Sequence, residues 1–136
     1  MESERQSKVV EAALDAAESA GFDQFDRHVV FESGLTFDGV ALRDEIETIY
    51  LFEVILLGTQ EAIPPERVEA ASKRARALRR VYENLEVRVG TRLTFLIVTE
   101  LEGDAFLKLV RSMRRRFCFR RGQDVRIFPT TALSLK

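Results

Sequence analysis

The sequence predicts a single α/β domain in which a mixed sheet of about five strands is flanked by helices on both faces. Three observations lead to this class. Helical and strand patterns alternate in the order α-β-β-β-α-β-α-β, and no linker rich in Gly, Pro or Ser separates them. The third strand segment, residues 49–58, is apolar on both sides, as in a strand covered on both faces. A chain of 136 residues builds one hydrophobic core, so we expect one domain over residues 1–136.

The first half of the chain reads as a helix followed by an antiparallel meander. Apolar residues at helical spacing predict a helix over residues 4–20, and Gly21 follows where a helix often ends with positive φ. Strands are then predicted over residues 27–32, 35–42 and 49–58, separated by turn residues. The third of these strands should lie in the middle of the sheet.

The second half adds two helices and two strands. Pro65 opens the second helix, because proline is tolerated in a first turn whose N–H groups lack partners. A strand is predicted over residues 92–100, Asp104 caps a third helix, and residues 124–129 form a short last strand. A meander that feeds a crossover helix and a parallel strand gives a mixed sheet with helices on both faces.

Several classes of protein are disfavoured by composition. No apolar run approaches the roughly 18 residues of a membrane span, and the polar N-terminus does not resemble a signal peptide, so we expect a cytoplasmic protein without a membrane partner. One cysteine, Cys118, and one histidine, His28, cannot supply an internal disulfide or a usual zinc site. His28 is interpreted as a strand-edge residue. Phosphate-binding glycine motifs and a nucleophile elbow are absent from the sequence.

Charge divides the chain into halves of opposite sign. Residues 1–66 contain 4 Lys or Arg against 15 Asp or Glu, whereas residues 67–136 contain 17 against 7. The two halves therefore carry net charges of −11 and +10. Either the two charged faces serve solubility and mutual attraction, or an acidic site lies beside a basic wall that attracts phosphate.

Two acidic residues stand out in the meander. Asp38 lies on the second predicted strand, and Glu53 lies inside the apolar third strand. An ionised carboxylate that is buried without a partner costs several kcal/mol. A bound cation would offset this cost; the alternatives are that Glu53 reaches solvent or pairs with an arginine of the second helix.

The order of elements, with "FDG" on the second strand and "YLFEVI" on the third, resembles the restriction-endonuclease-like fold of the PD-(D/E)XK nuclease superfamily over about residues 4–99. The resemblance implies that Asp38 and Glu53 are the catalytic acids. With the carbonyl of Val54 they would hold Mg²⁺ or Mn²⁺, and Glu11 on the first helix would be a looser third acid. Such a metal takes carboxylate oxygens, activates water and neutralises charge on the phosphate.

The lysine of the superfamily motif is missing, because Ile55 occupies its place. Residues i and i+2 of a strand face the same side, so Ile55 projects beside Glu53 and can neither position water nor stabilise charge. Lys73 of the second helix is expected to face solvent, while Arg67 and Arg74 on one flank of the helix and Arg79 on the other are better placed to lean over the site. The resemblance therefore implies a nuclease-like domain in which cleavage is absent or impaired.

Basic residues on the second and third helices suggest a nucleic-acid partner, DNA or RNA. They suit a phosphate backbone, although solvated helix faces would have the same pattern. The predicted contacts are Lys73, Arg74, Arg76, Arg80, Arg111, Arg114 and Arg115. The alternative is a non-catalytic protein-interaction or scaffolding module, either a monomer or a homodimer, whose charged faces meet each other.

Overall fold

A five-stranded sheet in the order β1-β2-β3-β4-β5 runs through the centre of the computed structural model, which describes residues 2–117 and 121–133. Pairing is antiparallel from β1 to β3 and parallel from β3 to β5. Cys118 lies outside the described residues. The strands are β1 (Gln24–Val30), β2 (Thr36–Arg43), β3 (Thr48–Gly58), β4 (Gly90–Thr99) and β5 (Gln123–Pro129).

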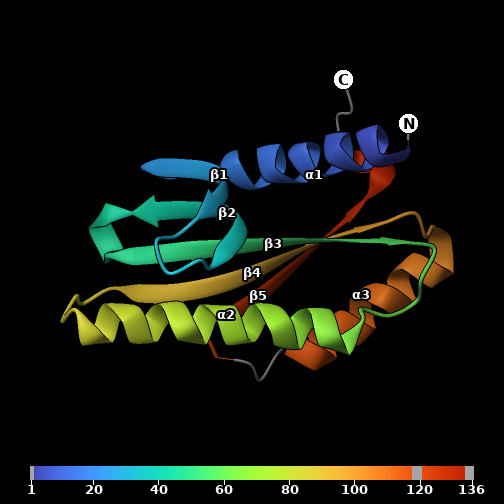
Figure 1. Ribbon diagram of the computed structural model, residues 1–136. Helices are drawn as coiled ribbons and strands as arrows, with labels where there is room; N and C mark the ends of the chain where they lie inside the picture. The colour runs from blue at the N-terminus through green and yellow to red at the C-terminus, as the bar shows by residue number, and fades with distance from the viewer. Residues whose placement is uncertain (1, 118–120, 134–136) are drawn as a thin grey trace.

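Three helices cover the two faces of this sheet. Helix α1 (Glu2–Glu18) lies on one face, and α2 (Pro65–Asn84) and α3 (Gly103–Phe117) lie on the other (Figure 1). The topology explains this division. β3, β4 and β5 are parallel neighbours that advance in one direction, so right-handed crossovers place both connecting helices on the same side.

The predicted architecture is confirmed at this level. The chain forms one α/β domain with a mixed five-stranded sheet and helices on both faces, and β3 is the central strand. Gly21 has φ +85°, as expected after the first helix. Two short 3₁₀ turns, Asp44–Ile46 and Thr130–Ala132, were not predicted. None of the helices in the described ranges has an apolar stretch long enough to cross a bilayer.

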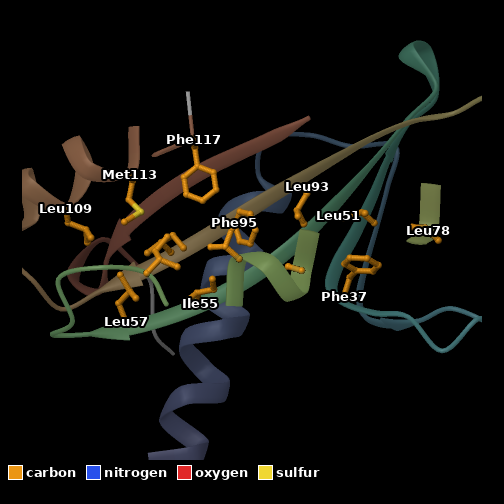
Figure 2. Close-up of a cluster of buried hydrophobic side chains, with 14 of the residues drawn as sticks. Phe37, Leu51, Ile55, Leu57, Leu78, Leu93, Phe95, Leu109, Met113 and Phe117 are labelled. Atoms are coloured by element: carbon orange, nitrogen blue, oxygen red, sulfur yellow. The ribbon is translucent and has the colours of Figure 1, made fainter. Parts of the chain in front are cut away.

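Two hydrophobic clusters hold the layers together. The larger one fills the space between the sheet and the helices α2 and α3, where Ile55, Phe95, Leu109 and Phe117 are among its side chains (Figure 2). The smaller one packs α1 against the opposite face of β2, β3 and β4. Side chains on both faces of β3 enter these clusters. Its sequence is therefore apolar at both odd-numbered and even-numbered positions.

Helix α1 approaches the sheet closely over Gly39 of β2. A Cβ atom at this position would lie 3.1 Å from Cδ2 of Leu14, a fully buried leucine of α1. The glycine beside Asp38 thus has a packing role. The helix is brought near the part of β2 that carries the predicted acid.

Candidate functional site

Strands β2 and β3 separate at Asp38. Their regular pairing runs from Arg43 opposite Thr48 to Gly39 opposite Phe52, one residue short of Asp38. Beyond that point the Asp38 carboxylate oxygen Oδ2 accepts the backbone N–H of Val54 at 2.7 Å. The side chain of Asp38 therefore replaces a ladder hydrogen bond where the strands part.

Strand β1 is irregular at the same level. Its pairing with β2 passes from Arg27 opposite Gly39 to Val29 opposite Phe37 and omits His28, which has φ +52°. One residue is skipped on each strand and the register is the same on both sides, so the left-handed backbone at His28 interrupts the ladder without adding a residue. Nε2 of His28 lies 2.5 Å from Oε1 of Glu11 on α1. His28 lies on an edge strand, as predicted, and it ties that edge to α1.

Glu53 is buried on the α2 side of β3 and is paired with arginines. Its Oε2 accepts a hydrogen bond from Nη2 of Arg74 at 2.5 Å, and its Oε1 lies 3.7 Å from Nη2 of Arg67. Of the alternatives raised by the sequence, pairing with an arginine of the second helix is thus the one observed. Ile55, on the same face of β3, is buried in the larger hydrophobic cluster.

Arg74 is held entirely by internal contacts. Its Nη1 donates to the carbonyl oxygen of Thr36 at 2.6 Å, its Nη2 donates to Glu53, and its guanidinium lies 5.5 Å from the ring centre of Phe37. These contacts make Arg74 the structural partner of Glu53. Each terminal nitrogen thus donates one hydrogen bond inside the protein, while the side chain remains 28% exposed and its contact with nucleic acid stays a prediction.

The protonation of Glu53 reflects opposing influences. Burial raises the pKa of its carboxyl, and the nearby negative charge of Asp38 adds to this rise. Arg74 and Arg67 act in the opposite direction because they stabilise the ionised form. Asp38 and Glu53 are therefore close enough to interact electrically across the β2–β3 boundary.

A groove of about 610 Å³ lies between α1, the sheet and the start of α2. We call it the Asp38 groove; its lining comprises Gln6, Ser7, Val10, Glu11, His28, Asp38, Val54, Leu56 and Arg67. Two of the three predicted acids, Asp38 and Glu11, face this groove, whereas Glu53 faces α2. The structure thus places Asp38 and Glu53 beside each other in the sheet without directing both into one groove.

Glu11 is engaged on the α1 side of the groove. Its hydrogen bonds with His28 and then with Arg27 lower the pKa of its carboxyl. Arg27 also contacts Asp15 and Glu18, so one strand arginine binds three acids of α1. Sequence analysis missed this cluster. The signal was present, because acids at positions i, i+4 and i+7 share one face of a helix.

The residues of the predicted metal site do not fit a divalent cation as they are arranged. The carbonyl oxygen of Val54 accepts a hydrogen bond from Nη2 of Arg67 at 3.2 Å, and Glu53 is bound by Arg74. A cation at these oxygens would meet two guanidinium charges. Among the described residues, no group of three or more His, Cys, Asp or Glu side chains is arranged to hold a metal ion.

A basic hollow of about 450 Å³ lies on the outer side of α3. Its lining, which we call the α3 hollow, is Lys108, Arg111, Ser112, Arg115 and Arg116. Nη1 of Arg116 also donates to the carbonyl oxygen of Ile63 at 3.3 Å, which joins the hollow to the segment before α2. The remaining predicted contacts are exposed, namely Lys73, Arg76 and Arg80 on α2 and Arg114 on α3.

No family model, curated protein or solved structure matches this chain. The fold and the site define an α/β domain with two features. It has two neighbouring acids, of which Glu53 is paired with arginines of α2, and it has a basic hollow on α3.

Proposed function

We propose that this protein is a nuclease-like domain that binds DNA or RNA, and that divalent-metal-dependent phosphodiester cleavage in it is absent or impaired. The observation that supports binding is the α3 hollow, whose lining combines four cationic side chains with one serine. Such a concave basic surface suits consecutive backbone phosphates.

The distribution of charge over the layers favours the same partner. Helix α2 carries six basic and three acidic residues, and α3 carries five basic and one acidic. Helix α1, on the opposite face, carries two basic and five acidic residues. A polyanion is therefore attracted more strongly to the α2–α3 face than to the α1 face.

The interior of the site supports loss of cleavage. Ile55 replaces the motif lysine and is packed in the hydrophobic core, so it supplies no charge to a reacting phosphate. Arg67 and Arg74 contact the oxygens that would otherwise bind a metal. The nuclease-like kinship itself rests on the element order and on the placement of Asp38 and Glu53 on adjacent strands.

Binding is tested by fluorescence anisotropy with a labelled duplex and a labelled single strand over a salt series. We expect the wild type to bind, with an affinity that falls steeply with salt because counterions are released from the phosphates. The double variant Lys108→Glu/Arg111→Glu should lose most of this affinity. Lys8→Glu, a reversal on the exposed outer side of α1, is the matched control and should bind like the wild type. Flat titrations at low salt for the wild type would refute the proposal.

Cleavage is tested with the same substrates in Mg²⁺ and in Mn²⁺. We expect intact substrate after prolonged incubation. Cleavage that needs the metal and disappears in Glu53→Gln would show that the acidic pair is a working metal site after all. Cleavage that persists in Glu53→Gln would come from another source.

A further inference from the structure

We propose that Arg67 takes the place of a divalent cation at the acidic pair and binds a backbone phosphate directly, so that nucleic-acid binding needs no metal. This inference rests on the proposed function and assigns a particular residue to one phosphate. It concerns the first turn of α2, where the strands β2 and β3 separate beneath it.

The position of Arg67 supports the first half of the inference. Its Nη2 donates to the carbonyl oxygen of Val54 at 3.2 Å and lies 3.7 Å from Oε1 of Glu53. The same side chain lines the Asp38 groove. One guanidinium thus lies beside the carbonyl of Val54 and the carboxylate of Glu53, in a groove that Asp38 also lines, and it supplies a permanent positive charge there.

The charges around Arg67 leave it available for a ligand. Glu53 is already balanced by the closer Arg74, and the Asp38 carboxylate accepts the Val54 N–H. Glu11, on the other side of the groove, is paired with Arg27 at 2.7 Å. The acids near the groove are therefore engaged by protein donors, while the Arg67 side chain remains 47% exposed.

The chemistry of the guanidinium identifies the ligand as a phosphodiester. A guanidinium has five N–H donors in a planar fork that matches two oxygens of a phosphate, and one of its hydrogen bonds here is directed to Val54. The α3 hollow adjoins the start of α2 through the contact of Arg116 with Ile63, four residues before Arg67. This contact connects the hollow to the segment that leads into the first turn of α2, where Arg67 lies.

The test measures duplex binding by anisotropy in EDTA and in Mg²⁺ at matched ionic strength. The variants are Arg67→Ala, Arg67→Lys and the control Arg88→Ala, an exposed arginine beyond the opposite end of α2. We expect wild-type affinity to be the same in both buffers. Arg67→Ala should weaken binding roughly ten-fold at about 50 mM salt and reduce the salt slope by about one, the value for one lost phosphate contact. Arg67→Lys should recover the slope, because it restores the charge.

Two results would overturn the assignment of Arg67. One is an Arg67→Ala variant that matches Arg88→Ala in affinity and salt slope; the other is wild-type binding that requires Mg²⁺. If either result is found while Lys108→Glu/Arg111→Glu still abolishes binding, the proposed function stands and only the role of Arg67 is refuted. If the wild type binds neither nucleic acid, the proposed function itself fails.

Substitution for the metal is tested separately by titrating Mn²⁺ and following the free ion by electron paramagnetic resonance. The wild type and Glu53→Gln should give the same titration curve, because Arg67 and Arg74 already neutralise Glu53. One equivalent of Mn²⁺ bound by the wild type and lost in Glu53→Gln would refute the inference, whatever the result with nucleic acid.

Discussion

Glu53 shows how a charged side chain is accommodated in the most apolar strand of the chain. Its carboxylate is almost fully buried and pairs with Arg74, which is itself anchored by the Thr36 carbonyl. A buried pair of this kind adds little net stability compared with apolar residues, yet removing one partner leaves a charge without compensation. The stability of the β2–β3 region therefore depends on both members being present.

Arg74→Ala is expected to lower the free energy of unfolding by roughly 3 kcal/mol near pH 8, because it leaves Glu53 ionised and poorly compensated. The pKa of Glu53 is already raised and would rise further without Arg74. The folded state then binds a proton more readily than the unfolded state, so stability falls as pH rises above the ordinary carboxyl pKa of about 4.3. The deficit should accordingly shrink near pH 4.5. Urea unfolding followed by circular dichroism at the two pH values measures it.

Two companion variants make this result specific. Arg74→Ala/Glu53→Gln should be more stable at pH 8 than Arg74→Ala, because no buried charge remains. Arg76→Ala removes an arginine from the same helix that pairs with exposed Glu69, and it should change stability by less than about 0.5 kcal/mol. A pH-independent loss in Arg74→Ala would show that packing, not charge, explains its effect.

The strands of the meander change their pairing where the site lies. β2 loses its regular pairing with β3 at Asp38, and the β1–β2 ladder is interrupted at His28 and Asp38 without a change of register. His28 has a left-handed backbone at this interruption. Both residues line the Asp38 groove.

The left-handed backbone at His28 predicts an unusual order of stability. His28→Gly and His28→Ala both remove the contact with Glu11, but only glycine adopts φ +52° without a Cβ penalty. His28→Gly should therefore be more stable than His28→Ala by roughly 1 kcal/mol. Chemical unfolding of the two variants under one set of conditions measures which of them is more stable. In a regular strand the order would be reversed, so an alanine variant at least as stable would contradict the left-handed backbone.

The molecule as a whole separates its charge by layer. The acidic α1 and the basic helices α2 and α3 lie on opposite faces of one sheet (Figure 1). This arrangement follows from the order of elements, because the acidic half of the sequence ends near the start of α2. It leaves the basic face open to a polyanion, and it is also the arrangement through which copies of the protein could attract one another.

Sedimentation distinguishes these two uses of the charged faces. If the basic face serves nucleic acid, the protein should remain a monomer across the micromolar range at low salt and form a larger species only when a labelled oligonucleotide is added. A concentration-dependent dimer that dissociates at high salt, without affinity for nucleic acid, would favour the alternative of a protein-interaction module. The double variant Lys108→Glu/Arg111→Glu can be used in both experiments, because it removes positive charge from the basic face.

The sequence by itself determined the order of the elements, the central position of β3 and the common face of Glu53 and Ile55, because these follow from local periodicity and from short connections between neighbours. It also pointed to Arg67, Arg74 and Arg79 as the arginines near the acids. Arg67 and Arg74 contact Glu53, whereas Arg79 donates to Thr91. Only the tertiary structure decided which partners these residues take. The contacts of Arg67 with Val54, of Arg27 with three acids of α1 and of Arg116 with Ile63 join residues far apart in the chain. These contacts form because of where β2 and β3 separate, the left-handed backbone at His28 and the placement of the helices. No local sequence pattern specifies these features.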